Sequence, residues 1–323
     1  MTCLCRMLVL ALVWTSVAGD RTAFAVDYPT RPLRWIVGFS PGGSTDTVAR
    51  LVARSLSKHL GQEVVVENRT GASSNIAAQF VANSPPDGYT LLLITSSNAI
   101  NATLNRTLPF NFLTEIQPIA GLVLGPNVMV VNPSVPARTV ADFILHAKAN
   151  PGKINMASSG TGTSVHLSGE LFKAMTRVNL VHVPYRGSAP AMVDLVAGRV
   201  QVMFNVMATS LPYIQSGKIN ALGVTTHRRS KALPELPAIA ETVPGYEAAI
   251  WLGVGVAKGT SNEIIAKLNE AINAVLAEAD IRARVEDLGF RTIPMSPAEF
   301  QAHVSAEVEK WATVIEFAGV KPE

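Results

Sequence analysis

Two stretches rich in glycine and hydroxyl residues carry the residue types that bind anions. The first, SPGGSTDTVAR at 40–50, follows an apolar run and opens a segment of helical periodicity. Glycine lets backbone N–H groups approach a ligand, and a helix N-terminus offers unpaired donors and a partial positive charge. These features predict a site for a carboxylate that needs no cationic side chain. The candidate contacts in this loop are Phe39, Gly42, Gly43, Ser44 and Asp46.

Asp46 differs from its neighbours in this loop because it carries a negative charge. Its carboxylate either caps the helix or accepts a hydrogen bond from a hydroxyl, an amine or a bridging water of the ligand. A plainer interpretation of the whole stretch is a tight turn followed by a capped helix, with no ligand. Taken alone, the stretch leaves both interpretations open.

The second stretch, ASSGTGTSVHLSGEL at 157–171, repeats the pattern farther along the chain. Hydroxyl side chains surround two glycines before another helical segment, so backbone amides and hydroxyls again suit a carboxylate or a phosphate. His166 is either a base or ligand contact, or a histidine that packs in the first turn of the helix. The candidate contacts here are Ser158, Thr161, Gly162, Thr163, Ser164 and His166.

The ends of three further predicted strands add polar candidates. Ser96 and Ser97 follow an apolar strand and either contact a ligand or cap the next helix. Tyr185 ends another strand beside Arg186, and both could reach a ligand carboxylate, although an arginine at the surface is equally consistent. Asn205 ends a third strand at the same predicted edge.

Motifs for other kinds of chemistry do not occur in the sequence. No Lys-Ser or Lys-Thr pair follows the glycines as in a nucleotide-binding loop, and 157–171 is not a GxSxG nucleophile turn. The histidines lack HExxH or another metal-ligand spacing. No pair of titratable residues is placed for acid–base catalysis. We therefore expect no catalytic residue, no metal and no cofactor.

Length and composition indicate a large α/β protein. The chain has 323 residues, of which 48% are hydrophobic and 16% charged, enough for a sizeable core spread over two domains. Its net charge is +3, and the basic residues are scattered. Nucleic-acid binding needs a concentrated basic patch, so we exclude that class of partner. A mildly positive field favours small anionic ligands.

Residues 1–25 have the pattern of a secretory signal peptide. Arg6 precedes an apolar stretch at 7–18, and 23–25 form a small-x-small cleavage site. The apolar stretch is about 12 residues long, too short to span a bilayer, although an uncleaved anchor is the alternative. We therefore expect an exported, periplasmic protein. The mature chain would contain no cysteine, because the signal peptide holds both Cys3 and Cys5.

Alternating apolar segments predict two α/β lobes. The first series consists of strands at 33–39, 63–68 and 89–95 with helices at 45–60 and 73–84. Strand–helix–strand order predicts a parallel sheet with right-handed crossovers. The second series consists of helices at 139–150, 163–176 and 189–198 with strands at 153–159, 180–185, 200–205 and 219–226. Three more helices are expected at 261–279, 280–288 and 297–318.

Two extended stretches connect the series. The first, 119–133, is broken by Gly125-Pro126 and carries the chain into the second lobe, while 248–259 returns it. We expect lobe 1 to comprise 26–125 and 252–323, and lobe 2 to comprise 126–251. Ligands of open α/β sheets bind where strands run into helices, so the loops of both lobes are expected to face one cleft.

Four segments together resemble a known family. They are PGGSTD at 41–46, ENRTGA at 67–72, PPDGYTLL at 85–92 and VPYRG at 183–187. In this order the chain resembles the Bug receptors, the extracytoplasmic solute-binding proteins of tripartite tricarboxylate transporters. The resemblance extends over 28–323, and the combination of segments is far more specific than any one of them.

The resemblance implies a two-lobed, type II-like periplasmic binding fold that closes like a Venus flytrap over a small organic acid. It implies that the loops at 39–47 and 158–166 hold one carboxylate, with ordered waters. Two departures concern the distal part of the pocket: GASSN at 71–75 replaces a more usual GAGG segment, and Asn205 stands where many members have aspartate. The identity of the ligand therefore does not carry over.

The expected function is a monomeric receptor that captures a small organic carboxylate and delivers it to a membrane permease of the tripartite tricarboxylate type. Two alternatives use the same scaffold. A secreted enzyme acting on a carboxylate would need His166 or Asp46 in a chemical role. A sensory partner would present the ligand to a membrane kinase instead of a transporter.

Overall fold

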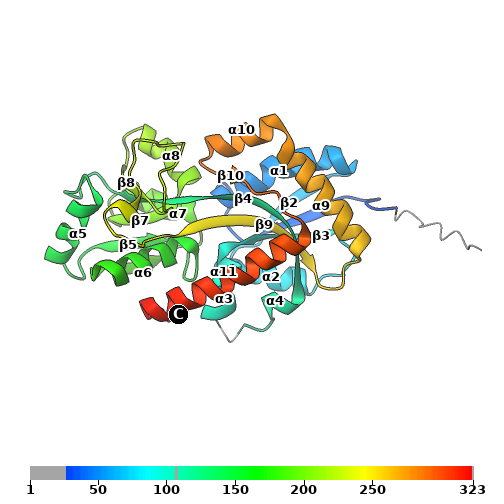
Figure 1. Ribbon diagram of the computed structural model, residues 1–323, viewed down its shortest axis with the longest axis horizontal. Coiled ribbons are helices and arrows are strands. Elements are labelled where there is room, and N and C mark those ends of the chain that lie inside the picture. The colour runs from blue at the N-terminus through cyan, green and yellow to red at the C-terminus, as the bar shows by residue number, and fades with distance from the viewer. Residues whose placement is uncertain (1–26, 106–107, 322–323) are drawn as a thin grey trace, which may run out of the picture.

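The chain folds into an elongated α/β molecule of two lobes that share one curled sheet (Figure 1). The computed structural model describes residues 27–105 and 108–321, so the predicted signal peptide and both cysteines lie outside the described residues. The two-lobed α/β fold expected from the sequence is confirmed. The strands are β1 (Leu33–Val37), β2 (Val64–Asn68), β3 (Thr90–Thr95), β4 (Ile116–Val131), β5 (Asn155–Ser158), β6 (Val181–Pro184), β7 (Val202–Val206), β8 (Asn220–Val224), β9 (Ala249–Ala257) and β10 (Arg291–Thr292).

Two parallel units lie at opposite ends of the sheet, whose strand order is β2-β1-β3-β9-β4-β7-β5-β6. Strands β2, β1 and β3 are parallel, as are β7, β5 and β6. The helices that follow these strands are α1 (Ser44–Leu60), α2 (Asn75–Ala82), α3 (Ser96–Leu104), α6 (Ser164–Thr176), α7 (Ser188–Val196) and α8 (Met207–Gln215). The carboxyl ends of these strands, where they enter the helices, meet between the lobes.

The long strand β4 joins the two halves and corrects one expectation. Its first part pairs antiparallel with β9, and from Asn127 onward it pairs with β7 and β8. Gly125 and Pro126 do not break it, because they pair with Ile250 and Ala249 on β9. A proline lacks the N–H of a ladder bond, and Pro126 lies where β4 changes partners, a position that tolerates the loss.

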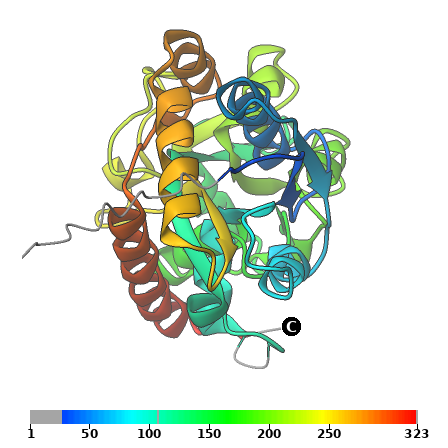
Figure 2. The same cartoon turned by 90° about the vertical axis from the view of Figure 1, so that its right-hand side faces the viewer.

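The C-terminal helix α11 (Pro297–Ala318) lies across both lobes (Figure 1), at the outer edge of the molecule (Figure 2). It packs on α3 from one half and α6 from the other. Its Trp311 is fully buried with Ile100 and Leu167, which come from these two helices. The remaining helices are α4 (Phe112–Glu115), α5 (Val140–Ala149), α9 (Asn262–Ala277) and α10 (Ala279–Asp287). No described helix is both long and apolar enough to cross a bilayer.

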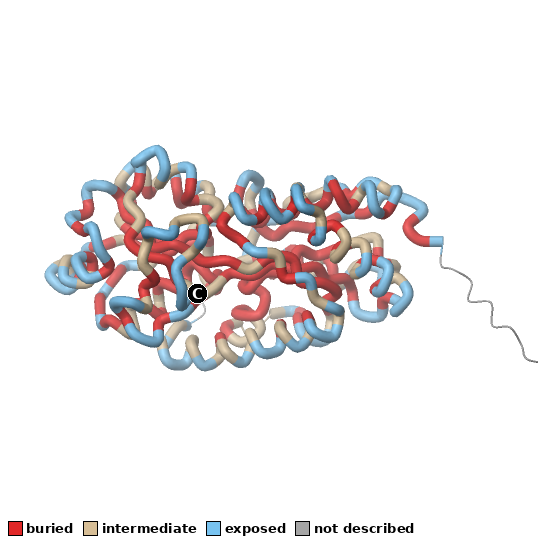
Figure 3. Tube along the Cα trace, turned by 45° about the horizontal axis from the view of Figure 1, so that its top comes forward, coloured by how far each residue is buried: buried red, intermediate tan, exposed pale blue. Residues whose placement is uncertain are grey.

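Buried residues follow the central strands, and exposed residues lie on the outer helices (Figure 3). Local differences from the sequence prediction fall near the cleft. The helix expected at 73–84 begins only at Asn75, because Ala72, Ser73 and Ser74 have positive φ angles of 44°, 52° and 77°. Helix α8, which contains Pro212, was not among the helices expected from the sequence.

Candidate ligand-binding site

Two adjoining cavities lie between the lobes. The smaller has a volume of about 20 Å³ and is less open to solvent than the larger, which has about 290 Å³. Phe39 and Ser159, one from each half of the molecule, line both cavities. Loops at the carboxyl ends of strands from both halves supply most of the lining, as the strand order predicted.

Helix N-termini converge on the small cavity. Helices α1, α6 and α7 begin at residues that line it, and Thr95 and Ser97 line it on either side of the first residue of α3. Helices α1 and α7 follow Gly43 and Gly187 and have no side-chain cap, whereas Thr139, Ser261 and Ser296 cap helices α5, α9 and α11. The first-turn N–H groups of an uncapped helix need a partner from elsewhere. At α1 and α7 the cavity is placed to hold that partner.

The lining of the small cavity is polar but uncharged. Most of its residues carry a hydroxyl, and none carries a charged side chain. Its members are Phe39, Ser40, Gly43, Ser44, Thr45, Thr95, Ser97, Ser159, Thr163, Ser164, Val165, Ser188, Val206 and Ile250. The buried Ser40 Oγ has no hydrogen-bond partner within the described part of the chain. Such a cavity offers hydroxyl and N–H donors to one small anionic group, which fits a carboxylate.

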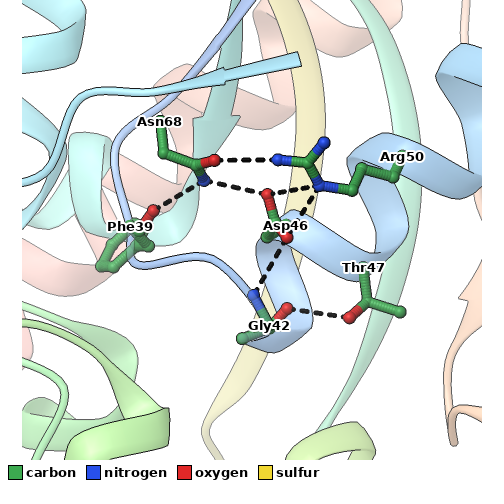
Figure 4. Close-up of polar contacts among 7 residues, drawn as sticks. Phe39, Gly42, Asp46, Thr47, Arg50 and Asn68 are labelled. Carbon is green, nitrogen blue, oxygen red and sulfur yellow. Dashed lines mark hydrogen bonds and ion pairs between the residues drawn. The ribbon is translucent and has the colours of Figure 1, made fainter.

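Asp46 supports the first loop from behind (Figure 4). Its carboxylate accepts hydrogen bonds from the Gly42 N–H at 3.0 Å, the Asn68 amide at 2.9 Å and the Arg50 guanidinium at 2.9 Å. The same Asn68 amide also donates to the Phe39 carbonyl at 3.0 Å. Burial raises the pKa of Asp46, but the hydrogen bonds from Arg50, Gly42 and Asn68 outweigh it and hold this pKa below its usual range.

His166 and Ser158 support the second loop in a similar way. The buried His166 Nδ1 accepts a hydrogen bond from the Gly162 N–H at 3.2 Å, and the ring stacks on His182 with centroids 3.9 Å apart. Ser158 Oγ lies 2.6 Å from His182 Nε2 and accepts from the Gly160 N–H at 3.1 Å. These side chains therefore fix the backbone of the loop.

The two lobes touch directly across the cleft. Ser73 Oγ donates to the Thr161 carbonyl, and Asn101 Nδ2 donates to the Gly162 carbonyl at 3.1 Å. Gly162 has a φ of 75°, and a Cβ there would lie 2.6 Å from Asn101 Oδ1. Only glycine permits both this backbone conformation and this close approach. The lobes are thus in a closed arrangement.

The larger cavity extends from the small one toward solvent. Its lining is Gly38, Phe39, Gly71, Ala72, Ser73, Asn75, Asn101, Leu104, Asn105, Ser159, Gly160, Thr161, Pro184, Tyr185 and Arg186. The Tyr185 hydroxyl donates to Asp194 at 2.7 Å. Burial and then the Asp194 carboxylate raise the pKa of Tyr185 to about 12, so its hydroxyl stays protonated. The hydroxyl of Tyr185 is therefore already engaged with Asp194, although the residue lines the cavity.

The structure brings about half of the sequence-predicted contacts to the two cavities. The residues that line one or both are Phe39, Gly43, Ser44, Ser97, Thr161, Thr163, Ser164 and Tyr185. The residues outside both linings are Gly42, Asp46, Ser96, Ser158, Gly162, His166 and Asn205. Most of the second group lie one layer behind the loops. Asn205, for example, is fully buried and donates to Ser210 Oγ at 3.0 Å.

Some lining residues did not appear among the sequence candidates. The loop after β2 contributes Gly71, Ala72, Ser73 and Asn75, so the unusual GASSN segment does face the distal part of the pocket. Ser188 and Thr95 line the small cavity from the starts of α7 and α3. These residues could have been found from the sequence by the criterion that selected the other candidates, because each lies where a strand runs into a helix.

The histidines and carboxylates of the described residues do not assemble a metal site. Within residues 27–105 and 108–321, no group of three His, Cys, Asp or Glu side chains is placed to hold an ion. The polar groups at the cavities are instead amides and hydroxyls, with the guanidinium of Arg186 at the larger cavity, and these donors suit an organic anion.

Comparison with known proteins identifies the family. The model for the tripartite tricarboxylate transporter family receptor matches residues 48–320. The chain belongs to this receptor family. Its fold is shared with a solved structure of the periplasmic binding protein BugD, which is 34% identical, has a TM-score of 0.86, and covers 92% of this chain and 100% of its own.

Two solved structures of similar proteins contain ligands. Rpa4515 of R. palustris with adipate is 41% identical, with a TM-score of 0.90 over 92% of this chain and 100% of its own. MatC of Rhodopseudomonas palustris with bound malate is 30% identical, with a TM-score of 0.85 over 89% of this chain and 100% of its own. Both of those ligands are small dicarboxylates. The tripartite tricarboxylate receptor family therefore consists of solute-binding proteins, and carboxylates are bound by these two relatives of the chain.

Proposed function

We propose that this protein captures a small organic carboxylate between its lobes and delivers it to a membrane permease of a tripartite tricarboxylate transporter. One carboxylate occupies the small cavity, and the rest of the ligand extends into the larger one. The combined size suits a small acid, because sites for drug-sized ligands span about 300–1,000 Å³ and the larger cavity has about 290 Å³.

The observation that carries this proposal is the pair of uncapped helix starts at the small cavity. Helices α1 and α7 come from opposite lobes, so a ligand carboxylate that caps both joins the lobes. Because only the closed arrangement offers donors from both sides, such a ligand favours closure. In the small cavity the donors are amides and hydroxyls with no cationic side chain, which favours the release that transport needs.

The proposal places the mature protein in the periplasm as a monomer, after removal of residues 1–25. It assigns lobe 1 to 26–125 and 252–323 and lobe 2 to 126–251. It also treats the protein as a receptor and not an enzyme. Asp46 and His166, the side chains that an enzyme on this scaffold would need, are engaged in supporting the loops.

Calorimetry of the mature protein with a panel of carboxylates tests the proposal. The panel contains succinate, malate, glutarate, adipate and citrate, with glucose and phosphate as unrelated solutes. In the variant Gly43→Val, a side chain would enter the small cavity at the start of α1. We expect a loss of about tenfold to a hundredfold in affinity, since a charge-assisted hydrogen bond contributes about 1.5–3 kcal/mol.

The matched control is Lys58→Val, which places the same residue on the exposed last turn of α1. This variant should bind as the wild type does. If no carboxylate in the panel binds the wild type, the proposed function is wrong. If Gly43→Val binds normally, the carboxylate does not occupy the small cavity.

A further inference from the structure

The charge in the lining of the cavities is concentrated at one residue. Among the described residues that line either cavity, Arg186 alone carries a charged side chain. It belongs to the larger cavity and is exposed to solvent. The other polar groups there, such as Ser73, Asn75 and Asn101, are neutral. A group at this end of the ligand therefore meets a single positive charge.

The charge of Arg186 is not neutralised by any carboxylate in the described part of the chain. In the ranges 27–105 and 108–321 its side chain makes no ion pair and no hydrogen bond. The acidic residue on the following helix, Asp194, is already engaged, accepting from Tyr185 at 2.7 Å and from Arg199 at 2.6 Å. Hydrogen bonds from these two side chains hold the pKa of Asp194 below its usual range, so it stays ionised and paired.

One short loop connects Arg186 to the carboxylate end of the site. Arg186 directly precedes Gly187, the uncapped start of α7, and Ser188 of the same helix lines the small cavity. A ligand whose first carboxylate lies in the small cavity thus extends past Phe39 and Ser159 into the space beside Arg186. The two ends of the site are set by neighbouring residues of a single β6–α7 loop.

We infer that Arg186 determines specificity by pairing with a second carboxylate at the far end of the ligand, so that the receptor prefers diacids to monoacids of equal length. This inference rests on the proposed function. A guanidinium binds a carboxylate through two parallel N–H···O bonds, which an uncharged methyl end cannot replace. The anchor for the first carboxylate is the same for both kinds of acid, so the preference arises at Arg186.

Calorimetry with three ligands of one length, adipate, hexanoate and 6-aminohexanoate, tests the inference, and succinate, butyrate and 4-aminobutyrate repeat it at a shorter length. The wild type should bind the diacid about tenfold to a hundredfold more tightly than the monoacid. In Arg186→Gln this ratio should fall toward one. Arg186→Lys keeps the charge without the fork geometry, so it should retain part of the preference.

Two more variants sharpen the test. Arg186→Glu should reverse the order, so that the ω-amino acid binds more tightly than the diacid, a gain that misfolding cannot produce. Arg282→Gln makes the same charge change at an exposed position of α10 and should leave the ratio unchanged. A wild type that binds diacid and monoacid equally, or an Arg186→Gln variant that keeps the wild-type ratio, overturns the inference while leaving the carboxylate receptor intact. A wild type that binds no acid overturns both.

Discussion

At the residue scale, the polar side chains at the cleft divide into those that face the ligand space and those that shape it. Ser44 and Thr163 line the small cavity, whereas Asp46 and His166 hold the two loops from behind. Asp46 is only 4% exposed, and its carboxylate accepts the Gly42 N–H of the glycine turn. A negative charge therefore stands close to an anion site without facing it, because its hydrogen bonds are directed into the protein.

Asp46→Asn should destabilise the protein by about 1–2 kcal/mol at neutral pH, because one charge-assisted interaction is lost and the half-exposed Arg50 limits the gain from the ion pair. The pKa of Asp46 is lowered in the folded state, so its stabilising effect is present above the unfolded pKa of about 3.9. The effect is lost as the pH falls through the lower, folded pKa. Urea unfolding between pH 7 and pH 3 measures this.

The control for this prediction is Asp280→Asn, since Asp280 is 69% exposed and its ion pair with Arg284 lies at the surface. We expect little change in the free energy of unfolding for that variant. A difference between wild type and Asp46→Asn that stays constant down to pH 3 would contradict the assignment.

At the scale of elements, the starts of helices serve two purposes in this molecule. Away from the cleft, Thr139, Ser261 and Ser296 cap their helices, whereas no side chain caps α1 or α7 at the small cavity, where the proposed ligand carboxylate would bind. Helix α6 has both a side-chain cap and a start that lines the small cavity. Thr163 Oγ1 accepts from the His166 N–H at 3.2 Å and donates to the Gly160 carbonyl at 2.7 Å, while the residue also lines the small cavity.

Thr163→Val should therefore lower both stability and affinity. Loss of the cap costs about 0.5–2 kcal/mol in unfolding free energy, and the loop that presents N–H groups to the ligand loses its bond to Gly160. Thr139→Val removes an equivalent cap from α5, away from both cavities, and should lower stability alone. Thermal unfolding and calorimetry with adipate separate the two effects. Equal affinity in the two variants would contradict the role of Thr163 at the site.

The spacing of apolar residues was sufficient to predict most strands and helices, because buried strands and amphipathic helices have distinct apolar patterns. It also located the loops at the cleft, since the chain order of strands and helices dictates which ends meet. It could not predict three consecutive positive φ angles at Ala72, Ser73 and Ser74, nor the unbroken β4 across Pro126, because partners distant in the chain stabilise both. Nor could it decide whether Asp46 and His166 face the cleft, because that depends on Asn68 and His182 behind them.

At the scale of the whole molecule, closure depends on contacts that the lobes make with each other as well as with a ligand. Ser73 and Asn101 of one lobe donate to consecutive carbonyls, Thr161 and Gly162, of the other. These bonds form in the closed arrangement. They contribute to the balance between open and closed states before any ligand binds, and a ligand then shifts that balance.

A double variant, Ser73→Ala with Asn101→Ala, should shift the ligand-free protein toward the open form and raise the dissociation constant for adipate. Each net hydrogen bond contributes about 0.5–1.5 kcal/mol, so the expected loss is about 5-fold to 150-fold. Small-angle scattering measures the ligand-free population, and calorimetry measures the affinity. The control Ser216→Ala removes a bond to Pro212 within the exposed end of α8. An unchanged scattering profile of the double variant would contradict this account of closure.

The strands that cross between the lobes also bear on the side from which a ligand can reach the site. β4 and β9 run side by side from one lobe toward the other, so the molecule stays joined along one edge whatever the state of the cleft. The larger cavity, which Ser73 and Arg186 line from opposite lobes, is the more open of the two cavities. In the proposed function, the ligand would enter and leave through this opening, and a membrane permease that receives the ligand would have to contact the protein there.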